Sequence, residues 1–170
     1  MKRLTVVCGL IGLAFATQLN AQSPRLIFAQ LQGNNEVPVV SSPASGRFGA
    51  ILDITNQAID YQLNYDGLQA GVTQAHIHVA QPAVNGAIVV WLCGTAANPG
   101  PAGTQLCPQS GTISGTIRAS DIQAVGAQGF APGEFSELVW ALLNGYAYAN
   151  VHTAQSTGGE IRGQIGTGLP

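Results

Sequence analysis

Apolar and polar side chains alternate with a period of two in short segments along most of this chain. The clearest case joins residues 46–55 to residues 58–65 through Asn56 and Gln57. Because successive side chains of a β-strand point to opposite faces, each segment has one apolar and one polar face. The two segments therefore predict a β-hairpin.

Further segments of this kind extend the prediction to an all-β domain. Charged residues make up only 8% of the chain and glycines number 22, which suits short strands joined by tight turns. The other strands are expected over residues 25–31, 72–79, 87–93, 110–117, 148–153 and 160–165. Because residues 87–93 are almost wholly apolar, we expect them to form a central strand that is buried on both faces. The expected architecture is a Greek-key-like β-sandwich or barrel.

One short helix is predicted near the C-terminal end. After Pro132, apolar residues recur at helical spacing, and Asn144 with Gly145 supplies the stop. The residues at this spacing are Phe135, Leu138, Val139 and Leu142. The helix should cover one end of the β core. Earlier in the chain, Ser120 and Asp121 are expected to cap a helical turn over residues 122–125.

The first 21 residues have the layout of a secretory signal peptide. Lys2 and Arg3 precede an apolar run over residues 4–16, and Ala21 closes a stretch of small residues. The run is shorter than the roughly 20 apolar residues of a transmembrane helix, so no stable membrane anchor is expected. We therefore predict one domain over residues 22–170, soluble and exported to the periplasm or secreted.

The predicted mature domain is acidic. Removal of the signal peptide leaves four basic residues against eight acidic ones, and the net charge moves from −2 to −4. A basic surface for nucleic acid is therefore not expected.

Two of the three cysteines remain after the signal peptide is removed. In an oxidising compartment, Cys93 and Cys107 should form a disulfide across a loop that is rich in proline and glycine. The alternative, a thiolate metal site or a redox pair, needs closer spacing or a helix start.

Histidine occurs only three times, in two segments that are both predicted to be strands. His76 and His78 share a face with Gln74, while His152 shares a face with Tyr148 and Asn150. A fold that brings these strands together gathers all three imidazoles.

Four segments of the chain resemble the motifs of the CHRD domain family, which takes its name from chordin. They are residues 31–38, 75–78, 145–153 and 159–164, in the order of the family. The resemblance implies a single β-rich extracellular domain and says less about activity.

The histidines are candidate ligands of one transition metal. Imidazole suits copper and zinc, and an exported domain without free thiols or methionine has to bind through nitrogen and oxygen, so we place copper ahead of zinc. Three histidines leave a fourth position open for water or substrate. Gln74, Asn150 and Glu160 are candidates for orienting the imidazoles.

Copper–zinc superoxide dismutases offer a more distant analogy. They also use a strand His-x-His, a later histidine and an arginine near the open face, a role that Arg162 is placed to take. This chain has no fourth histidine, no bridging histidine for a second metal and no aspartate in the matching place. It therefore lacks the full ligand set of a superoxide dismutase. A structural ion pair between Arg162 and Glu160 is an equal alternative to this guiding role.

Two alternatives stand beside the metal hypothesis. In one, His76, His78, Asn150 and Thr153 form a buried hydrogen-bond network that fixes the strand pairing. In the other, the domain is a non-catalytic module that binds an extracellular protein through an exposed apolar patch around Phe130 and the loop closed by Cys93 and Cys107. The oligomeric state is left open.

Overall fold

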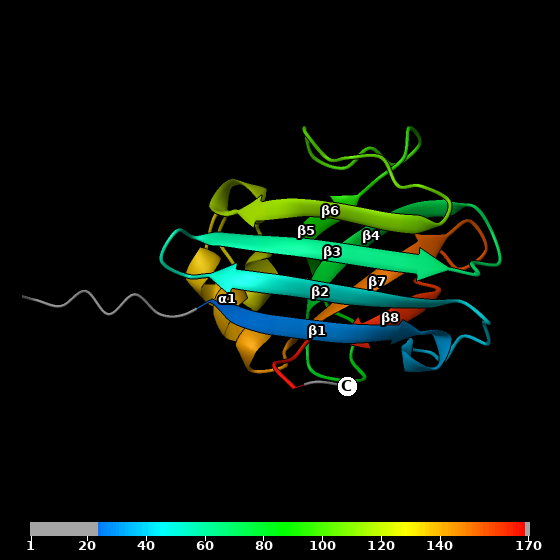
Figure 1. Cartoon of the computed structure of the whole chain (residues 1–170), viewed down its shortest axis with the longest axis horizontal. Coiled ribbons are helices and arrows are strands. Elements are labelled where there is room, and N and C mark those ends of the chain that lie inside the picture. The colour runs from blue at the N-terminus through cyan, green and yellow to red at the C-terminus, as the bar shows by residue number, and fades with distance from the viewer. Residues whose placement is uncertain (1–23, 169–170) are drawn as a thin grey trace, which may run out of the picture.

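Eight antiparallel strands form one sheet that curls into a nearly closed barrel in the computed structural model, which describes residues 24–168 (Figure 1). The strands are β1 (Arg25–Gln32), β2 (Ser45–Asp53), β3 (Ala58–Asp66), β4 (Val72–Val79), β5 (Ala87–Cys93), β6 (Gly111–Arg118), β7 (Ala147–Thr153) and β8 (Ile161–Gln164). Their order in the sheet is β5-β4-β7-β8-β1-β2-β3-β6. The predicted all-β class is confirmed. The predicted signal peptide, residues 1–21, lies outside the described residues.

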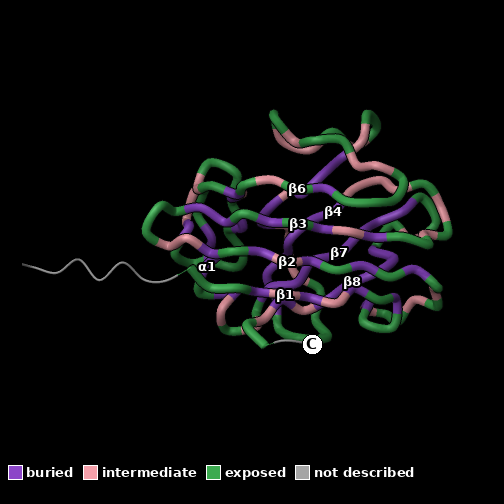
Figure 2. The backbone as a smooth tube through the Cα atoms, in the orientation of Figure 1, coloured by how far each residue is buried: buried purple, intermediate pink, exposed green. Residues whose placement is uncertain are grey.

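The predicted hairpin is β2 and β3, which pair over their whole lengths. Apart from Ile51, the large apolar side chains of both strands point into the barrel, where Phe48, Leu52, Ile59 and Leu63 join the core. Buried and exposed positions alternate along these strands (Figure 2). The period-two pattern therefore reports the inner and outer faces of the barrel wall.

β5 is an edge strand, so its predicted central position is wrong. Its only strand partner is β4 among the described residues. The open edge is capped by the backbone N–H of Gln123, which donates to Val89 O (2.9 Å), and by the Tyr61 hydroxyl, which donates to Leu92 O (3.1 Å). Cover from these neighbouring segments explains why an edge strand carries so many apolar residues.

The predicted helix is α1 (Phe135–Leu143), and it lies at one end of the barrel (Figure 1). Its apolar positions are buried, and the chain then enters β7 directly. Three short 3₁₀ turns complete the fold: η1 (Gly33–Asn35), η2 (Ala119–Asp121) and η3 (Gly126–Gln128). Within residues 24–168, no helix has the length and apolar character needed to cross a membrane.

The turn predicted over residues 122–125 is displaced towards the N-terminus, to η2. The carboxylate of Asp121 accepts a hydrogen bond from the backbone N–H of Arg118 (2.8 Å). Asp121 therefore closes the turn that contains it, and Ile122 is already extended.

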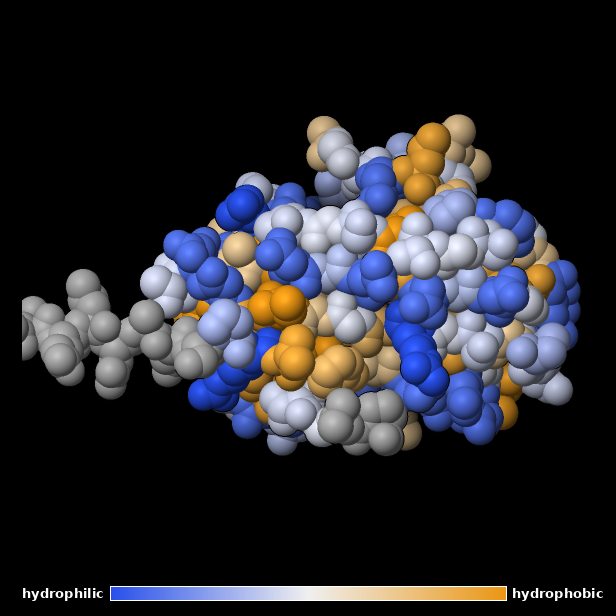
Figure 3. Space-filling view, in the orientation of Figure 1, coloured by the Kyte–Doolittle hydropathy of each residue, from blue (hydrophilic) through white to orange (hydrophobic). Residues whose placement is uncertain are grey.

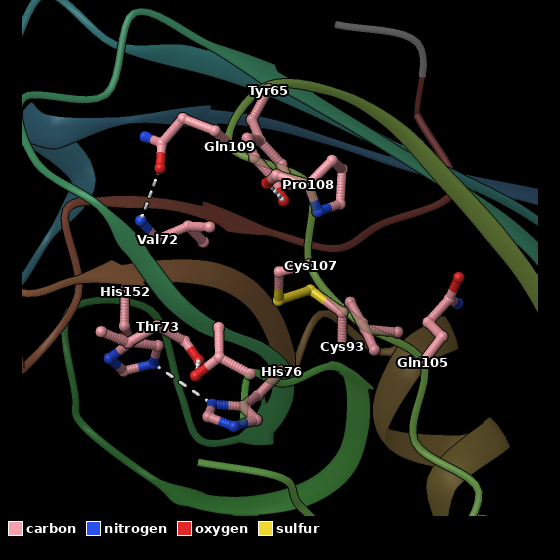
Figure 4. The surroundings of a disulfide bond; sticks show 12 residues. Tyr65, Val72, Thr73, His76, Cys93, Gln105, Cys107, Pro108, Gln109 and His152 are labelled. Carbon is pink, nitrogen blue, oxygen red and sulfur yellow. Dashed lines mark hydrogen bonds between the residues drawn. A yellow bond between two sulfur atoms is a disulfide. The ribbon is translucent and has the colours of Figure 1, made fainter. Parts of the chain in front are cut away.

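The predicted disulfide joins Cys93 at the end of β5 to Cys107. Figure 4 shows it beside β4, with Pro108 and Gln109 continuing along the chain towards β6. The Tyr65 hydroxyl donates to Pro108 O (2.7 Å), and Gln109 Oε1 accepts from the backbone N–H of Val72 (3.2 Å). The bond and these contacts attach the loop to the barrel, and they exclude a thiolate metal site.

Candidate metal centre

The three histidines meet on the outer face of the barrel wall, where β4 lies beside β7. In this pairing His76 is opposite Asn150 and Gln74 is opposite His152, so His76 and His152 are diagonal neighbours. His76 Nδ1 lies 3.2 Å from His152 Nε2 (Figure 4). One nitrogen from each of His76, His78 and His152 lies within 4.8 Å of the others. This is the spacing of a group that can hold one metal ion.

The histidine cluster is buried, although it lies on the face predicted to be polar. The exposed fractions are 0% for His76, 7% for His78 and 6% for His152. The ring of Trp91 packs edge to face against His76 (4.2 Å between centroids), and the ring of Tyr148 stacks on His78 (4.7 Å). Ala75 and Ile77 fill the barrel core on the other face of β4. β4 is therefore covered on both faces.

Burial keeps the three imidazoles neutral. It lowers the pKa of His76 to about 2, with His152 and His78 adding to the effect, and lowers the pKa of His78 to about 4. Burial also lowers the pKa of His152 below its usual value. Neutral imidazole is the form that binds metals.

Backbone carbonyls fix two of the tautomers. His78 Nδ1 lies 3.0 Å from Gly86 O, and His152 Nδ1 lies 2.9 Å from Thr157 O. A carbonyl oxygen only accepts hydrogen bonds, so both Nδ1 atoms carry the proton and both Nε2 atoms carry a lone pair. Such a partner on the other ring nitrogen is typical of metal-binding histidines.

Two of the buried ring nitrogens have no hydrogen-bond partner within residues 24–168: His76 Nε2 and His78 Nε2. Buried polar atoms in proteins are rarely left in this state. A bound metal ion would satisfy the His78 lone pair.

The predicted orienting residues take different positions. Asn150 Oδ1 lies 3.0 Å from His152 Nε2, and Gln74 lies across from His152 in the sheet. Glu160 contacts the loops instead, because its carboxylate accepts from Ser42 Oγ (2.7 Å), the backbone N–H of Gln69 (2.8 Å) and Thr153 Oγ1 (2.8 Å).

Arg162 is buried between the outer face and the β4–β5 loop. Its guanidinium lies 3.4 Å above the Tyr148 ring and donates to Asn85 Oδ1 (3.1 Å) and Val84 O (2.7 Å). The carboxyl group that attracts it is that of Glu36. Arg162 therefore holds the loop over the Tyr148 ring, which itself stacks on His78.

A model of the CHRD domain matches residues 27–165, from β1 to just beyond β8. The chain belongs to the CHRD domain family. The match spans all three histidines and confirms the resemblance seen in the motifs. No curated protein and no solved structure shows a significant match to this chain.

Glu36 is a residue of this CHRD domain whose burial the sequence did not predict. It follows η1 in the β1–β2 loop, yet only 4% of it is exposed. Burial raises its pKa to about 7, against the attraction of Arg162 and hydrogen bonds from Val37 and Asn150. Glu36 also lies on the wall of a cleft of about 750 Å³ beside Arg162. The turn-rich sequence around it gave no sign that this loop folds back onto the barrel.

The apolar surface of the CHRD domain differs from the predicted patch. Phe130 is only 8% exposed and belongs to the core, so a patch around it is wrong, whereas Leu106 in the disulfide loop is 72% exposed. A separate exposed pair, Leu26 and Ile51, lies side by side on β1 and β2. Figure 3 shows apolar side chains gathered over these two strands.

Proposed function

We propose that this CHRD domain binds one transition-metal ion, copper ahead of zinc, through His76, His78 and His152. The observation that carries the proposal is the anchoring of two imidazoles by carbonyl oxygens of neighbouring loops. This anchoring leaves the Nε2 lone pairs of His78 and His152 inside a buried group whose third member is His76. His76 Nδ1 lies 3.2 Å from His152 Nε2 and can donate to it, whereas His78 Nε2 has no hydrogen-bond partner within residues 24–168. A network with a purely structural role would be expected to pair this buried atom as well.

The ligand chemistry favours copper or zinc. Neutral imidazole is a good ligand for both, and divalent copper binds a given set of nitrogen and oxygen ligands more tightly than zinc does. The disulfide removes Cys93 and Cys107 as ligands. The site therefore depends on nitrogen, with oxygen as the other available donor.

The enclosure of the histidines favours holding a metal over turning over a substrate. With at most 7% of any of the three exposed, a substrate has little access to the ion. Copper sequestration in the periplasm or outside the cell is therefore the role we propose first, and superoxide dismutation second. Export is supported by the basic and apolar start of the chain and by the disulfide.

The test is the metal content and affinity of the mature domain, purified without a histidine tag. We expect one equivalent of copper, bound tightly in competition with a chelator. His78→Gln and His152→Gln should each lose tight binding, since each removes a ligand. Tyr65→Phe is the matched control, because it deletes a buried hydroxyl contact away from the cluster and should bind as the wild type does.

Circular dichroism of every variant separates the alternatives. Loss of copper from well-folded histidine variants supports the metal site. Absence of binding by the wild type, or unfolding of both histidine variants, would instead assign the histidines to a structural hydrogen-bond network.

A further inference from the structure

Asn150 makes a contact with the histidine cluster that hydrogen bonding does not explain. Its Oδ1 atom lies 3.0 Å from His152 Nε2. Because His152 Nδ1 donates to Thr157 O, the imidazole tautomer with its proton on Nδ1 carries its lone pair at Nε2. An amide oxygen also offers only lone pairs, so neither atom supplies a proton to the contact. Two buried acceptors at this distance repel each other unless a cation lies between them.

The spacing fits atoms that share one metal ion. Bonds of about 2.0–2.1 Å to a metal place neighbouring ligand atoms about 2.9 Å apart at a right angle and about 3.3 Å apart at a tetrahedral angle. Asn150 Oδ1 lies 3.0 Å from His152 Nε2, and His76 Nδ1 lies 3.2 Å from the same nitrogen. Both separations fall within that range.

Glu36 and Gly159 explain why the amide keeps its oxygen turned towards the histidines. The other end of the amide, Nδ2, lies beside the buried carboxyl group of Glu36, whose pKa it helps to lower. Glu36 Oε1 has no hydrogen-bond partner within residues 24–168, so it is free to accept from this amide. Gly159 makes room for both groups: a Cβ atom there would overlap Glu36 Oε1 and lie 2.8 Å from Asn150 Nδ2. The φ angle of Gly159, +126°, also favours glycine.

We propose that Asn150 Oδ1 is the fourth ligand of the metal and that Glu36 is the positioning residue that orients it. This inference rests on the proposed metal-binding function and deepens it by naming the ion. Three imidazole nitrogens and one amide oxygen suit Cu²⁺, whereas Cu⁺ is selected by soft sulfur ligands. Asn150 therefore sets a preference for divalent over monovalent copper.

The test compares Cu²⁺ and Cu⁺ binding in wild type, Asn150→Leu and Asn150→Asp. Leucine keeps the approximate size without an oxygen, and aspartate restores an oxygen ligand. We expect Asn150→Leu to weaken Cu²⁺ binding on the order of 10- to 100-fold. Its Cu⁺ affinity, measured against a chromogenic Cu⁺ chelator, should change far less. The electron paramagnetic resonance spectrum of the Cu²⁺ form should shift in Asn150→Leu and return towards wild type in Asn150→Asp.

Glu36 variants test the positioning role. Glu36→Leu removes the acceptor that orients the amide and should give the Cu²⁺ spectrum of Asn150→Leu, while Glu36→Gln keeps a carbonyl oxygen and should retain the wild-type spectrum. If Asn150→Leu does not fold, Asn150→Ala repeats the test with a smaller side chain that also lacks an oxygen.

The outcomes separate this inference from the proposed function. Copper bound by the wild type with an unchanged spectrum and an unchanged ratio of affinities in Asn150→Leu overturns the fourth ligand and leaves the three-histidine site standing. Absence of copper from the wild type overturns the site itself.

Discussion

The buried carboxyl group of Glu36 should make the stability of this domain depend on pH in a way that one substitution removes. Its ordinary pKa of 4.5 rises to about 7 in the folded protein, chiefly because burial penalises the charged form. Between these values, the folded protein binds a proton that the unfolded chain releases. The stability associated with this proton is present below pH 4.5 and is lost as the pH rises through 7.

The size of the effect follows from the shift. Each pKa unit corresponds to about 1.4 kcal/mol, so a rise from 4.5 to about 7 costs the wild type about 3 kcal/mol between pH 4.5 and pH 8. Glutamine has the same shape and does not ionise. We therefore expect the free energy of unfolding of Glu36→Gln, relative to wild type, to increase by about 3 kcal/mol over this interval.

Urea denaturation of the metal-free proteins at pH 4.5 and pH 8 measures this difference. Comparing the two proteins at each pH cancels every other titrating group, as well as any constant effect of the amide. A difference in unfolding free energy between variant and wild type that is the same at both pH values would refute the burial of Glu36. Glu36 would then lie in water, and the β1–β2 loop would not be folded onto the barrel as described.

Three further predictions follow from the same structure. In metal-free protein, burial lowers the pKa of His78 from 6.5 to about 4, so the unfolded chain takes up a proton at a higher pH than the folded protein does. The stability that the neutral ring contributes is therefore present above pH 6.5 and is lost as the pH falls through 4. The stability of His78→Gln relative to wild type should therefore rise by about 3 kcal/mol from pH 7.5 to pH 4 in urea denaturation, and an unchanged difference would contradict the burial. Replacing Cys93 and Cys107 with serine should cost on the order of 3 kcal/mol, because the bond closes a loop with a sequence separation of 14; a thermal melt like that of the wild type would contradict this. Gly159→Ala should weaken Cu²⁺ binding on the order of 10- to 100-fold, as Asn150→Leu does, while keeping its β-sheet circular dichroism, because the added Cβ overlaps Glu36 and crowds Asn150. Wild-type affinity would contradict the positioning of Asn150 by Glu36.

Local patterns predicted the strands well because the alternation of apolar and polar residues within each strand marks its inner and outer faces. The alternation over residues 46–65 marks which side chains enter the barrel, and the His-x-His spacing places His76 and His78 on one face without any knowledge of the fold. His152 joined them because its strand shows the same alternation, although the sequence alone did not establish that β4 and β7 are neighbours.

The features that the sequence did not predict depend on how separate segments pack. β5 looked central because both of its faces are apolar, but it pairs only with β4, and its other edge is covered by the segment around Gln123 and by Tyr61 of β3. The turn-rich sequence around Glu36 gave no sign that this residue is buried, and Phe130, which was expected in an exposed apolar patch, belongs to the core. In each case, burial is decided by the tertiary contact that the segment makes, and the local composition carries little sign of it.

Both the barrel wall and its loops contribute groups to the histidine site. β4 and β7 supply the imidazoles, while three different connections each bring one group to that wall: Glu36 from β1–β2, the Gly86 carbonyl from β4–β5 and the Thr157 carbonyl from β7–β8. Two of those groups belong to the backbone, but Gly86 cannot be replaced freely, because a Cβ atom there would overlap the backbone of Val79. The loops around the histidines therefore carry sequence constraints of their own, at Gly86 and Gly159, that are separate from the constraints on the barrel interior. A designer who alters this site has to keep both glycines even if every other loop residue is changed.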